Sequence, residues 1–301
     1  MDFTYNACRL CPRKCGADRA EGTAKRPVCG ASDNIYAARA SLHMWEEPCI
    51  SGNRGSGTVF FSGCPLKCVF CQNKDISHSL HGKRVTAERL CEIFFELKKK
   101  GAHNINLVSP TPYIPDIAAA LRSARQNGLD LPIVFNSSGY ELPEALKLLD
   151  GLVDIYLPDF KYMSDELAKK YSLAPDYPKA AMAALEEMVR QRPEPVFNHD
   201  GNMLSGVIVR HLVLPGCTDD SRAVIKYLHE RYGDSIYISI MSQYTPVGEL
   251  DRYPELMRKL SGSEYDEVVD YAVELGVTQG FIQDCDSVGE SFIPAFDGQG
   301  I

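Results

Sequence analysis

Three cysteines in the first part of the chain have the spacing of a cluster-binding loop. They are Cys64, Cys68 and Cys71, in the segment Gly63-Cys64-Pro-Leu-Lys-Cys68-Val-Phe-Cys71. Cysteine thiolates are the usual protein ligands of iron–sulfur clusters. Three thiolates on one [4Fe–4S] cube leave the fourth iron without a protein ligand, so that iron can bind a chelating substrate. The spacing therefore predicts a cluster that takes part in chemistry on a bound molecule.

A zinc site or a set of buried thiols is the alternative interpretation of these cysteines. A structural zinc ion needs four ligands. No fourth cysteine or histidine lies close by, and His78 and His81 could complete a site only if the chain folds back. We therefore expect a cluster at this loop.

Four further cysteines, Cys8, Cys11, Cys15 and Cys29, form a second group near the start of the chain. The chain has 11 cysteines, an odd number, and we expect no export leader, so metal thiolates in a reducing cytoplasm are favoured over disulfides. Four cysteines suit tetrahedral zinc, but part of the spacing also resembles that of ferredoxins. We expect a second metal here, with zinc preferred over a second cluster. The sequence assigns no role to the isolated Cys49, Cys217 and Cys285.

The composition is that of a soluble globular enzyme. The 301 residues are 45% hydrophobic and 24% charged, with a net charge of −8. We find no apolar run of about 18 residues and therefore expect no membrane span. The negative charge argues against broad binding to nucleic acid or anionic lipid. Residues 1–30 carry +3 and the remainder −11, a local charge that we interpret as a solvated face.

Short apolar runs alternate with helical patterns from residue 58 onward. The predicted strands are Thr58–Ser62, Ile105–Ser109, Ile133–Asn136, Val153–Leu157, Val207–Leu214, Ile236–Met241 and Gly280–Gln283. Several are almost continuous in Val, Ile, Leu and Phe, which is typical of parallel strands buried on both faces. A helix is expected over Thr86–Lys100, and the polar interval Arg192–Ser205 predicts a hairpin or a flap. The alternation predicts an α/β fold whose parallel sheet curls into a full or partial barrel.

In such a barrel, chemistry occurs at the carboxyl ends of the strands. The cysteine loop follows the first predicted strand, and polar or turn-forming residues follow the others, including Asp159 and Lys161. Arg210 lies inside a strand pattern, where a buried arginine needs a partner, and a carboxylate-bearing ligand would supply one. We expect a single pocket at this end.

The cysteine loop resembles the motif of the radical S-adenosylmethionine (SAM) superfamily, with the aromatic Phe70 before its third cysteine. Other stretches are similar to the subgroup related to pyruvate formate-lyase activating enzyme. These are Glu46-Glu-Pro, Ile50-Ser-Gly, Gly55-Ser-Gly57, Val59-Phe-Phe-Ser-Gly-Cys64, Gly101-Ala-His-Asn-Ile-Asn106, Arg210-His-Leu-Val-Leu-Pro-Gly216 and Gln243-Tyr-Thr-Pro246. The resemblance covers nearly the whole chain, including the N-terminal cysteines. Cys49 stands where the subgroup pattern predicts Pro, and Pro112 where it predicts His.

The resemblance implies a partial (β/α)6 barrel over residues 57–301, preceded by a cysteine-rich metal module and connecting segment over residues 1–56. It implies a [4Fe–4S] cluster on Cys64, Cys68 and Cys71, with SAM bound to the fourth iron and cleaved by one electron to a 5′-deoxyadenosyl radical. It also implies site residues around SAM: Phe70 near the adenine, Ser109 to Thr111 near the methionyl amino group, Asn136 and Ser138 near the ribose, and Arg210 and His211 near the methionyl carboxylate or the substrate.

Three interpretations of the overall function are open at this point. The resemblance suggests activation of a glycyl radical enzyme under anaerobic conditions. The second is radical modification of a peptide or small metabolite. The third, from a different class, is a non-catalytic iron–sulfur or zinc protein that transfers electrons. A catalytic role requires a low-potential donor such as flavodoxin or ferredoxin.

Overall fold

The computed structural model describes residues 3–20, 27–248, 250–283 and 294–301. In this part of the chain ten strands pair in one sheet, in the order β10-β9-β8-β6-β5-β4-β2-β1-β3, with β7 paired to β8. The strands are β1 (Ile35–His43), β2 (Ser56–Phe61), β3 (Lys83–Val85), β4 (Ile105–Val108), β5 (Ile133–Ser137), β6 (Ile155–Pro158), β7 (Val196–Phe197), β8 (Met203–Leu212), β9 (Tyr237–Met241) and β10 (Gly280–Ile282).

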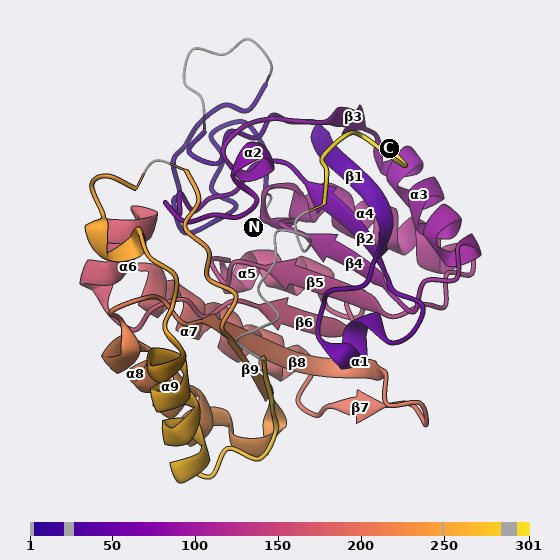
Figure 1. Cartoon of the computed structure of the whole chain (residues 1–301). Helices are drawn as coiled ribbons and strands as arrows, with labels where there is room; N and C mark the ends of the chain where they lie inside the picture. Colours follow the sequence, from indigo (N-terminus) through magenta and orange to yellow (C-terminus); the bar gives the residue numbers. More distant parts are fainter. Residues whose placement is uncertain (1–2, 21–26, 249, 284–293) are drawn as a thin grey trace.

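Seven strands that are neighbours in the sheet, β2, β4, β5, β6, β8, β9 and β10, run parallel. Together they curve into a partial barrel (Figure 1). The register aligns Val59 of β2 with Leu107 of β4, and Leu107 with Phe135 of β5. Every residue of β2, β4, β5 and β6 is buried, because side chains on both faces of these strands lie against protein. The predicted α/β fold with a parallel sheet is confirmed.

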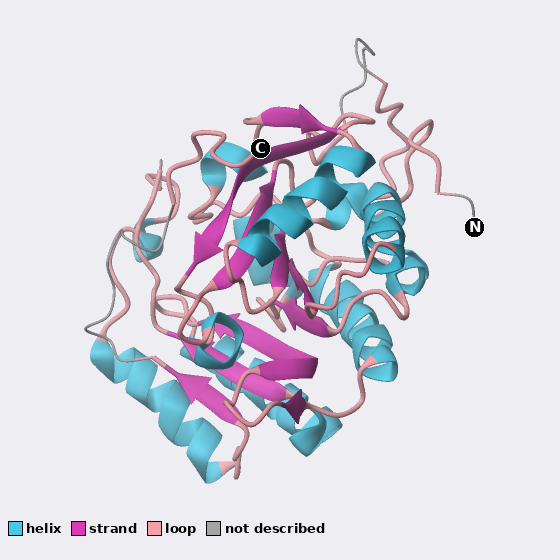
Figure 2. Ribbon diagram, turned by 90° about the vertical axis from the view of Figure 1, so that its right-hand side faces the viewer, coloured by secondary structure: helices cyan, strands magenta, loops and turns pink. Residues whose placement is uncertain are grey.

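Helices follow the strands and cover the outer side of the sheet (Figure 2). The α-helices are α1 (Pro48–Ser51), α2 (Lys74–Ser77), α3 (Ala87–Lys99), α4 (Ile114–Gln126), α5 (Pro143–Leu146), α6 (Asp165–Ser172), α7 (Tyr177–Gln191), α8 (Thr218–Tyr232) and α9 (Gly262–Glu274). Short 3-10 turns are η1 (Thr111–Tyr113), η2 (Lys147–Leu149), η3 (Gly233–Ser235) and η4 (Pro254–Leu256).

Helix α3 forms for the reasons that its sequence suggests. The Thr86 side chain accepts a hydrogen bond from the Arg89 backbone N–H and caps the first turn. Leu90, Phe94 and Leu97 are buried on one face, as the spacing of an amphipathic helix requires. The predicted helix over Thr86–Lys100 is confirmed.

Residues 35–43 differ from expectation. They were expected in a connecting segment, but they form β1, which pairs antiparallel with β2 and carries β3 on its other edge. The exposed edge of β2 needs hydrogen-bond partners, and β1 supplies them. The division of the chain after residue 56 stays a prediction. The interval 192–205 forms a hairpin, in which β7 pairs antiparallel with β8.

The described residues before β1 contain neither helix nor strand. Residues 3–20 and 27–34, here called the N-terminal module, have their own local backbone bonds: Cys8 N–H donates to the Ala17 carbonyl at 2.8 Å, and Lys14 N–H donates to the Cys11 carbonyl at 3.0 Å. Among the described helices, none has the length and apolar character needed to cross a membrane.

Candidate active site at the mouth of the partial barrel

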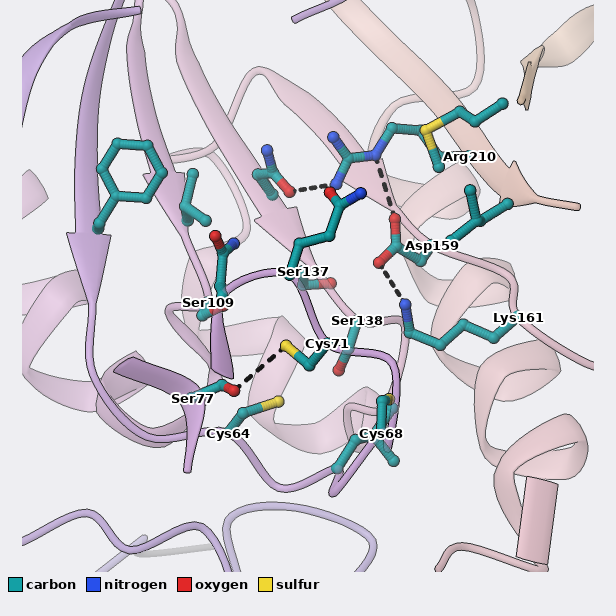
Figure 3. A pocket seen from close by; sticks show the side chains of 18 of the residues that line it. Cys64, Cys68, Cys71, Ser77, Ser109, Ser137, Ser138, Asp159, Lys161 and Arg210 are labelled. Carbon is teal, nitrogen blue, oxygen red and sulfur yellow. Dashed lines mark hydrogen bonds and ion pairs between the residues drawn. The ribbon is translucent and has the colours of Figure 1, made fainter. Parts of the chain in front are cut away.

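A cavity of about 210 Å³ lies at the carboxyl ends of the parallel strands. Its walls come from the cysteine loop after β2 and from the ends of β4, β5, β6, β8 and β9 (Figure 3). Parallel strands bring these ends together at one edge of the sheet. The single pocket expected from the sequence is therefore present, and we call it the mouth pocket.

The cysteine loop leaves β2 through a backbone position that only glycine fits. Gly63 has φ +88°, and a Cβ there would lie 3.0 Å from the Cys29 carbonyl oxygen. The loop is then anchored to the end of helix α6, because Val69 N–H donates to the Tyr171 carbonyl at 2.9 Å. The position of the loop therefore depends on residues outside the loop, Cys29 and Tyr171.

Cys64, Cys68 and Cys71 all line the mouth pocket (Figure 3). Burial raises the pKa of the Cys64 thiol, and the neighbouring thiols raise it further. Burial raises the pKa of Cys71 as well. Cys71 Sγ lies 3.2 Å from the Ser77 hydroxyl, and the Ser172 hydroxyl donates to Cys68 Sγ at 3.0 Å. Three mutually close thiols thus surround one edge of the pocket.

Three thiols at the pocket edge are the kind of donor set that a [4Fe–4S] cluster takes from a protein. No three cysteine, histidine or carboxylate side chains of the described residues converge where they would hold one metal ion. Also facing this pocket is Ser138, whose buried Oγ has no hydrogen-bond partner within the described structure. A buried polar atom of this kind is usually paired, so it fits a polar ligand here.

Opposite the cysteines lies a partly buried network of charges. The Arg210 guanidinium donates to Asp159 Oδ1 and to Glu46 Oε2, both at 3.1 Å, and to Asn136 Oδ1 at 2.6 Å. Lys161 Nζ donates to Asp159 Oδ2 at 2.7 Å. Two carboxylates and two cations therefore balance one another along one wall of the pocket.

The network sets the protonation of its members. Burial alone would raise the pKa of Asp159, but Lys161 and Arg210 outweigh burial and hold this pKa below its usual value. Burial lowers the pKa of Lys161, but Asp159 together with the nearby Cys68 and Cys71 outweighs burial and raises this pKa above its usual value. Burial raises the pKa of Glu46, and Arg210 opposes this shift. Asp159, Lys161 and Arg210 thus stay charged beside the pocket.

Residues 58–228, more than half of the chain, match the radical SAM superfamily. The chain belongs to the radical SAM superfamily. The superfamily implies a [4Fe–4S] cluster and SAM, and it accounts for three thiols at the mouth of a partial barrel.

Individual relatives are more distant. The uncharacterized protein MJ0674 of Methanocaldococcus jannaschii is 29% identical over 277 residues, which are 89% of this chain and 75% of that protein. The structure of Streptococcus suis SuiB bound to precursor peptide SuiA aligns with a TM-score of 0.50 and 15% identity. This alignment covers 74% of the present chain and 47% of SuiB, so the chain spans about half the length of SuiB and shares its fold.

One solved structure carries the name of the predicted subgroup, but its similarity to this chain is low. A domain of pyruvate-formate lyase-activating enzyme from Bacteroides vulgatus aligns with a TM-score of 0.42 and 10% identity, covering 61% of this chain and all of that domain. This similarity is too low to carry an argument about the subgroup.

In this radical SAM fold, five of the seven residues predicted around SAM line the mouth pocket: Phe70, Ser109, Asn136, Ser138 and Arg210. Ser109 has φ +58°, an uncommon conformation for a residue other than glycine and one that often marks a functional position.

The other two predicted residues, Thr111 and His211, are buried behind the pocket wall. The Thr111 hydroxyl donates to Glu141 Oε1 at 2.6 Å. His211 Nδ1 lies 2.8 Å from the Phe160 carbonyl oxygen, and burial lowers the pKa of His211 to about 4. Their side chains support the wall of the radical SAM site.

Arg210 also pairs with protein carboxylates, those of Asp159 and Glu46. Its expected contact with a ligand carboxylate stays a prediction. Glu46 was not predicted as a site residue. It precedes the barrel, and only residues at the ends of the predicted strands were considered. The signal available in the sequence was the adjacent carboxylate pair Glu46 and Glu47, in the stretch Glu46-Glu-Pro that the resemblance includes.

Proposed function

We propose that this radical SAM protein reductively cleaves SAM and abstracts hydrogen from a protein substrate, as an activator of a glycyl radical enzyme. The observation that carries the proposal is the mouth pocket, where Cys64, Cys68 and Cys71 face a charged wall that contains Asp159 and Arg210. In this proposal the three thiolates hold a [4Fe–4S] cluster at three of its irons. A cluster held there would supply the single electron that reductive cleavage of the SAM sulfonium requires.

The residues of the mouth pocket have distinct parts in this proposal. Phe70 is buried against Tyr244, with ring centroids 6.2 Å apart, and offers an apolar surface to the adenine. Ser138 Oγ supplies a free polar atom, and Ser109 and Asn136 lie beside it on the pocket wall. The charged groups of the network pair with one another within the protein. In this proposal the network holds Asn136 in place through Arg210 and orients the polar groups of SAM.

The N-terminal cysteines and the electron donor belong to the same proposal. Cys8, Cys11, Cys15 and Cys29 hold a second metal, and a low-potential donor such as flavodoxin or ferredoxin supplies electrons. A reduced cluster of this kind is sensitive to oxygen, so the proposed setting is an anaerobic cytoplasm.

The first step is tested by product formation. The anaerobically reconstituted full chain, reduced with dithionite, should form 5′-deoxyadenosine from SAM. Cys68→Ala should abolish this product because a cluster ligand is lost. Cys91→Ala is the matched control, since Cys91 is a buried cysteine of helix α3 that lies outside the mouth pocket. Reconstituted wild type that yields no 5′-deoxyadenosine would refute the proposal.

The substrate is tested separately. A glycyl radical doublet in the electron paramagnetic resonance (EPR) spectrum of a partner protein supports activation, whereas a mass change in a peptide or metabolite supports radical modification. Peptide modification is the second candidate, since SuiB shares the fold and is bound to a precursor peptide. A purely electron-transferring protein would instead show no change in the EPR spectrum of its reduced clusters when SAM is added.

A further inference from the structure

The outer edge of β1 is covered by a segment that returns from the far end of the chain. Strand β1 pairs with β2 on one side, and in the described sheet β3 covers only Ile35–Ala37 on the other side. Residues 294–301, here called the returning segment, lie against the part of β1 that follows (Figure 1). Gly298 N–H donates to the Ala38 carbonyl at 2.9 Å, and Ala40 N–H donates to the Gln299 carbonyl at 2.8 Å. The segment thus pairs with an edge to which another chain could bind.

Side chains of the returning segment fit matching groups on β1 and β2. The Phe296 ring packs against Phe60, with ring centroids 5.6 Å apart. Asp297 Oδ1 accepts a hydrogen bond from the Arg39 guanidinium at 3.0 Å. Gly300 has φ +77°, and a Cβ there would overlap a backbone carbonyl oxygen of β1, so this position requires glycine. The edge of β1 therefore recognises an aromatic side chain, then a carboxylate, and then a glycine three residues further on.

The returning segment also borders the mouth pocket. Pro294 lines this pocket, and so does Phe60, against which Phe296 packs. His43 is another lining residue, and its ring meets that of Phe60 edge-on, with centroids 5.8 Å apart. These residues lie on the β1 side of the pocket, away from the ends of β4 and β5. A segment that binds along β1 in this way therefore enters the pocket two residues before its aromatic side chain.

The returning segment is held lightly. None of its residues is fully buried, and Ala295, Asp297 and Gln299 are exposed. The ion pair between Asp297 and Arg39 leaves 56% of the Asp297 side chain exposed, and exposed pairs of this kind contribute little to stability. A segment held in this way can be exchanged for another segment that makes the same contacts.

We propose that the outer edge of β1 is a docking site for a segment of the protein substrate, and that the returning segment occupies this site until the substrate replaces it. The substrate segment presents an aromatic side chain to Phe60, a carboxylate to Arg39 and a glycine to the backbone of β1. The residue that loses hydrogen stands two positions before the aromatic residue, at the place where Pro294 lines the pocket. This proposal rests on the proposed function, since hydrogen abstraction is what brings a substrate residue into the pocket.

The contacts favour a protein segment over a small metabolite. Two of the groups that hold the returning segment are backbone atoms of Ala38 and Ala40. Their spacing matches a peptide backbone, as it does where a peptide adds to the edge of a sheet. A second copy of this chain carries the same residues 294–301, so the oligomeric state is part of the test.

Binding is tested with the full chain and the peptide Pro-Ala-Phe-Asp-Gly-Gln-Gly-Ile, the sequence of residues 294–301, by isothermal titration calorimetry. Phe296→Ser loosens the returning segment and leaves the docking site unchanged. Because a competitor that fills a site lowers its apparent affinity, this variant should bind the peptide about tenfold more tightly than wild type. Met257→Ser is the control, since Met257 is an exposed apolar residue outside the returning segment.

The charge of the site is tested in the same assay. A peptide with Lys in place of Asp should bind Phe296→Ser weakly, and Phe296→Ser/Arg39→Glu should reverse this preference. Equal affinity of wild type and Phe296→Ser for the first peptide would overturn the proposal. A dimer of Phe296→Ser in light scattering would also overturn it, because a second copy would then fill the site.

Exchange of the returning segment is followed by hydrogen exchange. The Ala40 amide should exchange faster in Phe296→Ser than in wild type, because the Gln299 carbonyl that accepts its hydrogen bond moves away. Added peptide should slow this amide again, and the amides of β5 should not change. An Ala40 amide that is equally protected in both proteins would show that the segment does not exchange, and would overturn the proposal.

The role of the docked segment as substrate is tested with acetylated Gly-Ala-Phe-Asp-Gly-Gln-Gly-Ile, whose first glycine carries deuterium at Cα and stands at the position of Pro294. With reconstituted Phe296→Ser, SAM and dithionite, the Cα–D bond breaks, a C–D bond forms at the 5′ carbon, and a glycyl radical remains. The 5′-deoxyadenosine should therefore contain deuterium. Product without deuterium, from a sample that binds the peptide, would overturn the proposal. Absence of 5′-deoxyadenosine would refute the proposed function instead, and the binding and hydrogen-exchange results would still decide the docking site.

Discussion

The cluster loop and the N-terminal module both carry cysteines, but they are built in different ways. The loop extends from β2, a strand that is buried throughout and paired on both edges. The described part of the module contains neither helix nor strand. The module depends instead on local turns and on side chains such as Arg13 and Arg19 that bind carbonyl groups of the barrel.

The mouth pocket and the N-terminal module therefore obtain their stability from different sources. The barrel positions its thiols and charges through the sheet. The module has few regular backbone bonds, so a bound metal should contribute to its order, as it does in other small metal-organised segments. Two arginines make this contrast testable, because the partly buried Arg210 neutralises carboxylates of the barrel and the buried Arg19 holds the module against the barrel.

The largest effect is expected for Arg210→Leu. This change leaves Glu46 without its cation and Asp159 with Lys161 alone, and breaking a largely buried pair costs about 3–5 kcal/mol of stability. Urea unfolding of the metal-free protein measures the loss.

Arg89→Ala is the matched control for Arg210→Leu. Arg89 pairs with Glu96 on the surface of α3, where 36% and 45% of the two side chains are exposed, and such surface pairs contribute about 1 kcal/mol or less. If the two variants unfold at the same urea concentration, the barrel does not depend on its charged network.

The second effect concerns pH and should act through the barrel alone. Burial raises the pKa of Glu141 from 4.5 to about 7, and the hydroxyls of Thr111 and Ser137 that donate to it oppose this shift. Between these values the unfolded chain has released a proton that the folded chain retains, so stability falls as pH rises from 4.5 to 7. At about 1.4 kcal/mol per pKa unit, the change is a few kcal/mol.

Glu141→Gln should remove this pH dependence. Urea unfolding of both proteins at pH 5 and pH 7 gives the comparison, with the difference between wild type and variant as the readout. An unchanged slope in the variant would show that other groups dominate. Hydrogen exchange of the module should be insensitive to the substitution.

The smallest effect is expected for Arg19→Leu. Arg19 is buried, donates to the Ser32 carbonyl at 2.9 Å and the Pro112 carbonyl at 2.6 Å, and lies 4.0 Å from the centre of the Tyr5 ring. Its loss leaves neutral carbonyls rather than charges unpaired, at a cost of about 1–3 kcal/mol. Hydrogen exchange should accelerate in residues 3–20 and stay constant in β4 and β5.

Arg9→Ala, an exposed position of the same module, is the control for Arg19→Leu. If Arg19→Leu accelerates exchange throughout the sheet, the module and the barrel unfold together and the contrast between them fails.

Much of the fold could be predicted because its signals are local. The apolar runs gave the parallel strands, and Thr86 gave the start of α3. The features that sequence reasoning did not supply depend on contacts distant in sequence. Strand β1 forms by pairing with the edge of β2 that β4 leaves open, and the Thr111 hydroxyl donates to Glu141, thirty residues later. Glu46 reaches the site from a segment that precedes the barrel.

The sequence by itself determined the chemistry that this protein carries, because ligand type and spacing are properties of a short segment. It determined three thiols at the end of a strand and, with them, membership of the radical SAM superfamily. Only the tertiary structure decided that Arg210 is satisfied by Glu46 and Asp159, and that Cys29 contacts Cys64. These pairings join residues far apart along the chain, and packing of the whole sheet is what brings them within hydrogen-bonding distance.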